Sequence, residues 1–254
     1  MTLSDSTTLS EYLLRLGDDR LVLGHRLSEW CGHGPILEED IALANIALDL
    51  IGQATLFLKL AGETEGKGRS EDALAYFREA IDYRNVHLVE LPNGDYAFTI
   101  VRQFLFDVFS YHLLEQLMTS SNTELAGIAA KGFKEVRYHV RHSSEWVVRM
   151  GDGTDESHTR AQKALDHLWR FTGEMFQADA IEKTMAADGV GADIEAIQPK
   201  WRAVIDDVMK RATLTIPNDP PAMTGGRRGS HTEHLGHMLS EMQIVARSHP
   251  GAEW

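Results

Sequence analysis

The amino-acid sequence predicts an all-α fold in which four long core helices form a bundle and additional helices surround them. Three observations lead to this prediction. Apolar residues recur at intervals of three and four along most of the chain, and the strict alternation typical of strands is nearly absent. Four of the expected helices reach about 25 residues, or ~37 Å, which suits the staves of one bundle. No shift in composition indicates a linker, so we expect residues 1–254 to form a single domain.

The N-terminal part of the chain predicts two long helices and a shorter one. Thr8 begins a capping-box pattern, and apolar residues follow it at helical intervals up to residue 30. The segment Gly32–Pro35 ends this helix, because glycine and proline interrupt helices. An apolar run predicts a second long helix over residues 41–60, and a shorter third helix is expected over residues 70–85.

Five further helices are expected in the rest of the chain. Asp95 follows a Pro-Asn-Gly turn signal and caps a fourth helix that runs to about residue 119. Thr123 caps a fifth helix, which ends at the turn Gly151–Gly153. The remaining periodic segments predict helices over residues 156–188, 193–212 and 232–248.

Composition excludes several classes of function. The chain has 25 Lys and Arg against 38 Asp and Glu, a net charge of −13, so it repels phosphate backbones and we expect no nucleic-acid partner. The N-terminus carries no basic residue, and no run of about 18 apolar residues occurs anywhere. We therefore expect no signal peptide and no membrane contact, and a cytoplasmic location. Cys31, the single cysteine, cannot form an intrachain disulfide and is expected in the core.

Several polar side chains interrupt segments that otherwise look buried. Asn45, Asp49 and Gln53 form a polar line, at intervals of four, in an almost entirely apolar helix. Asp107 interrupts an apolar run of the fourth helix, and Glu135 lies in the seam of the fifth. A lone carboxylate in a core is costly unless it is paired, protonated or bound to metal, so these acids need partners.

The turns place these acids at matching heights. Asp107 and Glu135 stand fourteen residues before and after Ser121, which lies in the turn between their helices, so an antiparallel hairpin brings them level. The same reasoning around the first turn brings Asp49 level with Asp19 or Arg20. Two charged layers at about 21 Å from their turns are typical of a ferritin-like carboxylate bundle.

The sequence nevertheless departs from the di-iron pattern of such bundles. That pattern takes a Glu from each of two helices and a Glu-x-x-His motif from each of the other two. Here Gly52 stands in the histidine place after Asp49, and Tyr138 stands in the histidine place after Glu135. His139 follows Glu135 by four residues instead of three, and no Glu-x-x-His occurs in the chain. We therefore expect no metal at these positions, which are degenerate.

Two interpretations of the buried charges remain open. The favoured one is a metal-free structural network in which cationic side chains compensate the acids. The other is a single-metal or irregular di-metal site. The network would consist of Arg20, Asp49, Asp107, Glu135 and His139.

A glycine-rich loop near the C-terminus offers a weak signal for an anion site. Arg227 and Arg228 lie within Gly225–Gly229, ahead of the last helix, where backbone amides and guanidiniums can contact the phosphates of CoA. Loops of this kind are more often solvated connectors, so this contact is a secondary expectation.

Several motifs, taken together, resemble a known family. They closely resemble the ferritin-like structural subunits, of the PaaC type, of bacterial phenylacetyl-CoA 1,2-epoxidases (ring 1,2-phenylacetyl-CoA monooxygenases), and the likeness covers nearly the whole chain. The segments that carry it are Leu16–Asp19, Leu27–His33, Leu43–Ala54, Pro92–Gly94, Lys134–His139, His231–Gly236 and Glu241–Gln243.

The resemblance implies a specific role. In that family the structural subunit pairs with a homologous catalytic subunit, which holds the di-iron centre and binds the CoA thioester. A separate reductase with flavin and iron–sulfur groups supplies electrons from NADPH, and dioxygen epoxidises the aromatic ring during aerobic phenylacetate degradation. The family's structural subunit has lost the metal site, so this chain is expected to hold no cofactor and no catalytic residue.

Two classes of function follow. The favoured one is a non-catalytic structural subunit of a multicomponent monooxygenase, which we expect to form homodimers when isolated. The rival is an independent metal-dependent oxidase or oxygenase that uses Asp49, Asp107, Glu135 and His139. Gly52 and Tyr138 distinguish the two, because they remove both histidines of the usual site.

Overall fold

The computed structural model describes residues 3–218 and 220–252, and within these residues the chain consists of helices and loops without strands. The predicted all-α class is confirmed, and the long helices are consistent with a ferritin-like bundle. The chain forms two compact units. Unit 1 comprises residues 1–33, 40–92 and 225–254, and unit 2 comprises residues 34–39 and 93–224.

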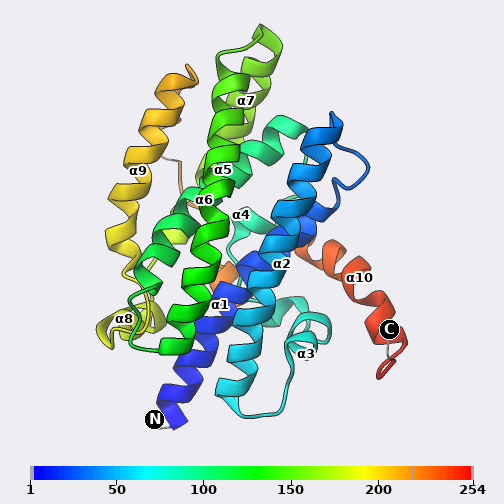
Figure 1. Cartoon of the computed structure of the whole chain (residues 1–254), viewed down its shortest axis with the longest axis vertical. Helices are drawn as coiled ribbons and strands as arrows, with labels where there is room; N and C mark the ends of the chain where they lie inside the picture. Colours follow the sequence, from blue (N-terminus) through cyan, green and yellow to red (C-terminus); the bar gives the residue numbers. More distant parts are fainter. Residues whose placement is uncertain (1–2, 219, 253–254) are drawn as a thin grey trace. The chain divides into compact units, whose positions relative to one another are not determined.

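Unit 1 is built on two long helices that lie side by side (Figure 1). Ser6 and Ser10 of the first helix donate hydrogen bonds to the carbonyls of Thr64 and Ala61 near the end of the second, at 2.5 and 3.1 Å. Its helices are α1 (Leu3–Ser28), α2 (Leu37–Glu65, in unit 1 from Asp40), α3 (Glu71–Tyr76), η1 (Ala80–Asp82), α4 (His87–Glu90), η4 (Gly226–Arg228) and α10 (Glu233–Ser248).

Two glycines of α1 allow α2 to approach closely. A Cβ atom added to Gly17 would lie 2.7 Å from Leu58 Cδ2, and one added to Gly24 would lie 2.9 Å from Ile51 Cγ1. Real Cβ atoms essentially never come so near to another heavy atom. These two positions, seven residues apart on one face of α1, therefore set the distance between the helices.

Unit 2 is organised around one almost fully buried helix. This helix, α5, packs against α6, α7 and α9. The indole nitrogen of Trp201 on α9 donates to the carbonyl of Leu105 on α5 at 2.9 Å, which fastens the two helices together. The helices of unit 2 are α5 (Tyr96–Leu117), α6 (Thr123–Gly151), α7 (Asp155–Leu168), η2 (Trp169–Phe171), η3 (Gly173–Phe176), α8 (Ala180–Ala187) and α9 (Ile194–Arg211).

The structure confirms the long helices and corrects several boundaries. Asp95 caps α5 by accepting from the backbone N–H of Phe98. The cap of α6 is Asn122 and not Thr123, and the first helix begins before Thr8, so the two cap predictions there were wrong. Asn is as good a helix cap as Thr, so the sequence alone did not distinguish Asn122 from its neighbour Thr123.

Two predicted helices are broken in the structure. The segment predicted as a helix over 70–85 stops at Tyr76, because the chain then turns to bury Arg78 and Tyr83. The segment predicted over 156–188 stops at Leu168 and continues as two short 3-10 turns before α8 begins. Those turns bury Trp169, Phe171, Met175 and Phe176 together, which a straight helix would spread around its circumference.

Two burial predictions were also wrong. Cys31 is exposed, in the turn after α1. Helix α2 is not buried all round, since Ile41 and Leu48 are 53% and 67% exposed and Asn45 is exposed as well. Among the described helices, α2 is the one long and apolar enough to cross a membrane by length and composition, a test that core helices of soluble proteins also pass.

Candidate functional site

The residues of the expected charged network divide between the two units. Arg20 and Asp49 belong to unit 1, whereas Asp107, Glu135 and His139 belong to unit 2. Each unit contains a buried polar cluster of its own.

Arg20 lies at the centre of the polar contacts between α1 and α2. Its guanidinium is fully buried, donates to Gln53 Oε1 and to the carbonyl of Leu16, both at 2.9 Å, and lies 4.8 Å from the ring centroid of Phe57. Burial lowers the pKa of Arg20 to about 10, and the negative charge of Asp19 opposes this shift. Of the predicted polar line on α2, Gln53 is thus buried against Arg20, while Asp49 is half-buried.

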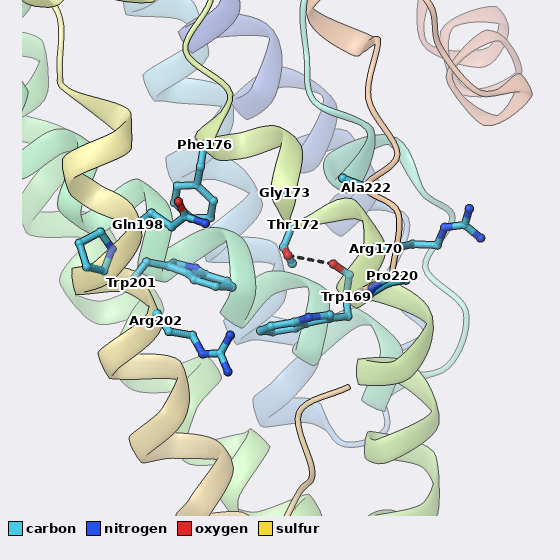
Figure 2. A pocket seen from close by; sticks show the side chains of 11 residues that line it. Trp169, Arg170, Thr172, Gly173, Phe176, Gln198, Trp201, Arg202, Pro220 and Ala222 are labelled. Atoms are coloured by element: carbon cyan, nitrogen blue, oxygen red, sulfur yellow. Dashed lines mark hydrogen bonds between the residues drawn. The ribbon is translucent and has the colours of Figure 1, made fainter. Parts of the chain in front are cut away.

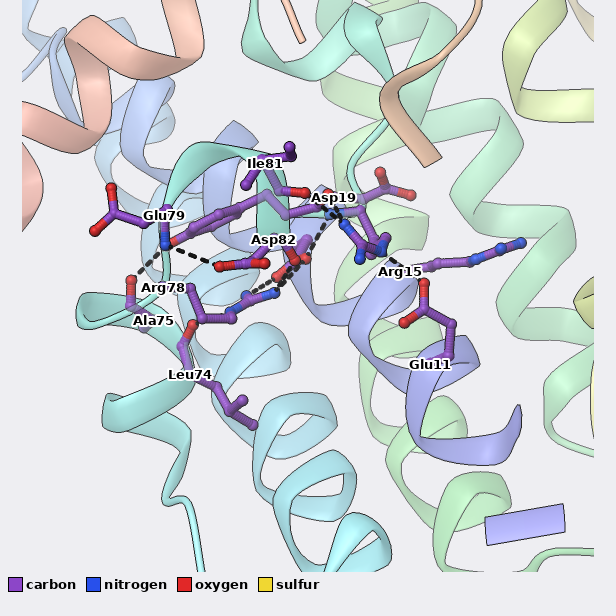
Figure 3. Close-up of polar contacts among 12 residues, drawn as sticks. Glu11, Arg15, Asp19, Leu74, Ala75, Arg78, Glu79, Ile81 and Asp82 are labelled. Atoms are coloured by element: carbon purple, nitrogen blue, oxygen red, sulfur yellow. Dashed lines mark hydrogen bonds and ion pairs between the residues drawn. The ribbon is translucent and has the colours of Figure 1, made fainter. Parts of the chain in front are cut away.

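Asp18 and Asp19 on α1 are both fully buried and are bound by arginines from distant parts of the chain. Asp19 and Arg78, one of these arginines, are labelled in Figure 3. Arg78 forms an ion pair with Asp18, and the backbone N–H of Arg84 donates to Asp18 Oδ2 at 2.8 Å. Arg227 contacts both oxygens of Asp19, at 3.0 and 2.8 Å.

Burial raises the pKa of Asp19, and the charge of Arg227 counteracts this effect. The guanidinium of Arg227 also donates to the carbonyls of Arg15 and Arg84. It is therefore occupied inside unit 1, whereas Arg228 is exposed. Of the two arginines considered for phosphate contact, Arg228 is the one whose side chain faces solvent.

Glu90 joins the C-terminal segment to the same unit. This carboxylate is fully buried and accepts from the backbone N–H of Thr232 at 2.6 Å and from Asn85 Nδ2 at 2.8 Å. His231 Nδ1 lies 2.7 Å from Glu90 Oε2, and its Nε2 lies 3.0 Å from the carbonyl of Tyr83. Both ring nitrogens of His231 thus contact oxygen atoms of the segment Tyr83–Glu90, which holds the start of α10 against unit 1.

In unit 2 the structure brings Asp107 and His139 together. Asp107 is 1% exposed and accepts hydrogen bonds from Gln103 Nε2 at 2.6 Å and from the hydroxyl of Ser143 at 2.8 Å. Burial raises the pKa of Asp107 to about 6, and the charge of the fully buried His139 is the largest effect in the opposite direction. Glu135 is half-buried and lies nearer to the turn between α5 and α6.

Counting equal distances from Ser121 predicts that Asp107 lies level with Glu135 on α6. Its hydrogen-bond partner on α6 is instead Ser143, which lies further from the turn. Cα–Cβ bonds tilt toward the N-terminus of a helix. In an antiparallel pair, the Asp107 side chain therefore leans away from the turn, while side chains on α6 lean toward it. Asp107 consequently meets Ser143 on α6, further along that helix than Glu135.

A second carboxylate in unit 2 was not predicted. Glu39, 7% exposed, accepts from the hydroxyl of Tyr96 at 2.6 Å and lies 2.8 Å from His142 Nε2. Burial and the bond to Glu39 raise the pKa of Tyr96. The ring of Tyr138 stacks on His142 at 6.0 Å between centroids and is itself 41% exposed.

The donor set does not fit a di-iron centre. Gly52 offers no ligand atom, and the ring of Tyr138 lies against His142 near solvent. Within residues 3–218 and 220–252 no three His, Cys, Asp or Glu side chains are grouped so that they could hold a metal ion. The buried carboxylates Asp18, Asp19, Glu39, Glu90 and Asp107 instead accept hydrogen bonds from the protein.

Comparison with known proteins identifies the family of this chain. Residues 1–254 match the family described as "Phenylacetic acid catabolic protein". The chain belongs to this family. It is 48% identical over 246 residues to one of the subunits of the 1,2-phenylacetyl-CoA epoxidase of Escherichia coli (strain K12), and the match covers 97% of this chain and 99% of that protein. The resemblance identified from the motifs is confirmed.

For this member of the phenylacetic acid catabolic family, sequence reasoning missed the carboxylates that lie at helix ends or beside other acids. Glu39 stands in the run Glu38-Glu39-Asp40, which is typical of a solvated helix start. Glu90 belongs to a four-residue helix that no periodicity reveals. Neither acid stands in a sequence pattern that distinguishes it from a solvated carboxylate.

Proposed function

We propose that the chain is the non-catalytic structural subunit of a phenylacetyl-CoA 1,2-epoxidase that acts in the cytoplasm during aerobic phenylacetate degradation. The observation that carries the proposal is the identity of 48%, over nearly the full length of both chains, to a protein named as a subunit of such an epoxidase. The core acids are bound by arginine, glutamine, serine and tyrosine side chains, which agrees with a scaffold role.

Partner proteins carry out the epoxidation. A homologous catalytic subunit holds the di-iron centre and the CoA thioester, and a reductase with flavin and iron–sulfur groups delivers electrons from NADPH. This chain itself contributes no cofactor and supports the catalytic subunit by packing against it.

The exposed apolar side chains of α2 support a partner on this helix. Ile41 and Leu48 are large, more than half exposed, and seven residues apart, so they lie on one face. Exposed apolar stripes of this kind mark protein interfaces. In the isolated chain the same face gives rise to homodimers, which the catalytic subunit displaces.

Co-expression with the homologous catalytic subunit tests the proposal. Size-exclusion chromatography should give one complex, and Leu48→Glu should abolish it because a charge would be buried at the interface. Lys210→Glu, an exposed position on α9 in unit 2, is the control and should leave the complex intact. Separate elution of the two unmodified chains at micromolar concentration contradicts the proposal.

A further inference from the structure

Unit 2 presents two features to solvent, a hollow beside α9 and a charged face on α6. The hollow has a volume of about 420 Å³, and Trp169 and Trp201 line it (Figure 2). These indoles are 4% and 3% exposed, so neither offers an open ring face to a ligand. The face of α6, in contrast, consists of exposed side chains and is open to a partner.

One face of α6 carries a row of positive charge. The five Lys and Arg side chains of this helix are all exposed, and they follow one another at intervals of three, three, four and eight residues. With about 3.6 residues per turn, these intervals place all five within about a third of the helix circumference, along a length of ~27 Å. Between the first and the last of them, Glu145 is the one exposed acid. The residues of this α6 basic face are Lys131, Lys134, Arg137, Arg141 and Arg149.

The cations of the α6 basic face are not neutralised within the described part of the chain. Elsewhere in unit 2, Arg160, Arg202 and Arg211 each pair with an acid one turn away on the same helix. No side chain of the α6 basic face forms an ion pair or a hydrogen bond with a described residue. Like charges three or four residues apart repel, so this row destabilises α6 unless acids from another molecule bind there.

An aromatic ring lies within this face. Tyr138 is 41% exposed, and its ring stacks on the buried His142 at 6.0 Å between centroids. The guanidinium carbon of Arg141 lies 5.6 Å from the centroid of the same ring. These two contacts restrict the orientation of the tyrosine. A partly exposed tyrosine beside arginines is typical of protein interfaces, in which both residue types are enriched.

We propose that the α6 basic face binds a second protein through a row of carboxylates, such as glutamates along one side of a helix. The two surfaces are complementary in charge, and acids from the partner remove the repulsion along α6. Tyr138 adds an apolar contact within the row. Because most of the contact area is charged and little of it is apolar, the complex forms and dissociates readily and is sensitive to salt.

The rest of unit 2 disfavours larger polyanions. Helices α7 and α9, which pack against α6, expose acids of their own. A nucleic acid or an anionic membrane extends beyond one helix and is repelled by these acids and by the net charge of −13 on the whole chain. A narrow row of carboxylates on a protein contacts the α6 basic face alone. The exposed acids on the two neighbouring helices include Asp155, Glu156, Asp166, Glu195, Asp206 and Asp207.

A designed peptide tests this surface without any epoxidase component, so the outcome is independent of the proposed function. The probe is a labelled helical peptide as long as the α6 basic face, with glutamates at intervals of three and four, and its control has glutamine at these positions. Fluorescence anisotropy measures binding to the full-length chain. The glutamate peptide should bind at least about tenfold more tightly than the control, because only the glutamates are charged. Raising the salt concentration from about 0.01 to about 0.1 M shortens the Debye length from about 30 to about 10 Å and should weaken this binding by about tenfold or more.

Two double variants locate the binding. When Arg137→Glu is combined with Arg141→Glu, the affinity for the glutamate peptide should fall by about tenfold or more, because two attractive contacts become repulsive. Lys163→Glu combined with Lys210→Glu is the control, since it changes the net charge equally at exposed positions of α7 and α9. This control should alter the affinity by less than about twofold, because distant exposed charges are screened. Urea unfolding verifies that both variants fold.

Four results overturn the proposal. Absence of binding at millimolar peptide, or equal binding of the glutamine peptide, shows that the α6 basic face does not select carboxylates. An unchanged affinity when Arg137→Glu and Arg141→Glu are combined places the contact elsewhere on the chain. Tighter binding of double-stranded DNA or of anionic lipid vesicles, in parallel titrations, shows that the surface serves a different class of partner.

Discussion

At the scale of single residues, the buried acids differ in how well they are compensated. Asp19 has an arginine on both oxygens, whereas Asp107 has two neutral donors and the charge of His139. This difference leads to two measurable consequences, one for the dependence of stability on pH and one for a substitution.

Asp107 should make the protein less stable as pH rises. Its pKa is about 6 in the folded chain against 3.8 as the ordinary value, so between these values the folded state keeps a proton that the unfolded state loses. The free energy of unfolding therefore falls through this window, by at most about 3 kcal/mol. Asp107→Asn should remove the decline and be more stable than the unmodified chain at pH 7.5.

The neighbours of Asp107 permit this exchange. Gln103 Oε1 is buried and makes no hydrogen bond to the described residues, so a flipped Gln103 amide can accept from the new Asn. Urea unfolding between pH 4 and 8 measures the effect, with the exposed Asp207→Asn as control. A profile that still declines between about pH 4 and 6 in Asp107→Asn, to the same extent as in the control, would show that another group is responsible.

Arg227 should be far more important for stability than its neighbour Arg228. Arg227→Gln leaves the fully buried Asp19 without the guanidinium that contacts both of its oxygens, and removing one partner of a buried pair costs about 3 kcal/mol or more. Arg228→Gln changes an exposed side chain and should alter stability by less than about 0.5 kcal/mol. Urea midpoints of the two variants compare them directly, and equal midpoints would rule out a stabilising role for the Asp19 pair.

At the scale of elements, the contact between α1 and α2 depends on glycine. Gly24→Ala would place a methyl group 2.9 Å from Ile51 Cγ1 and 3.3 Å from the carbonyl oxygen of Ala47. Overpacking of this kind costs about 1 to 3 kcal/mol, which outweighs the gain of up to about 1 kcal/mol in helix propensity. We expect Gly24→Ala to lower the thermal midpoint.

Gly52→Ala provides the matched control on the opposite helix. No described atom lies within 4 Å of the Cβ position at Gly52, so only helix propensity acts and stability should rise by up to about 1 kcal/mol. Calorimetry of both variants should give shifts of opposite sign. A higher thermal midpoint for Gly24→Ala would contradict this prediction, because it would mean that α1 and α2 move apart at this position without loss of stability.

The elements also show how far sequence reasoning reaches. Helical periodicity predicted the long helices, because a 3.6-residue repeat over seven turns has no competing interpretation. It failed over Trp169–Phe176, where burial of several aromatic rings on one side outweighs helix propensity. It also could not pair Arg78 with Asp18 or Arg227 with Asp19, since contacts across 60 and 208 residues leave no local pattern.

At the scale of the whole molecule, we expect the isolated chain to hold no di-iron centre. We predict that the chain purified aerobically with added iron carries close to none, because Gly52 and Tyr138 replace the histidines of the di-iron pattern. Elemental analysis of the purified chain measures this, and the co-expressed catalytic subunit is the positive control. About two irons per chain would instead favour the independent oxidase or oxygenase.

The pairing of Asp19 with Arg227 has a consequence for synthesis on the ribosome. The two residues are 208 positions apart, and at about 5–20 residues per second the arginine follows the acid by on the order of 10–40 seconds. Once residue 90 has been made, α1 and α2 are complete, while Asp19 and Glu90 still lack their partners from the C-terminal segment. A nascent chain stalled before residue 225 should therefore remain protease-sensitive in its first helices, although their own sequence has long emerged.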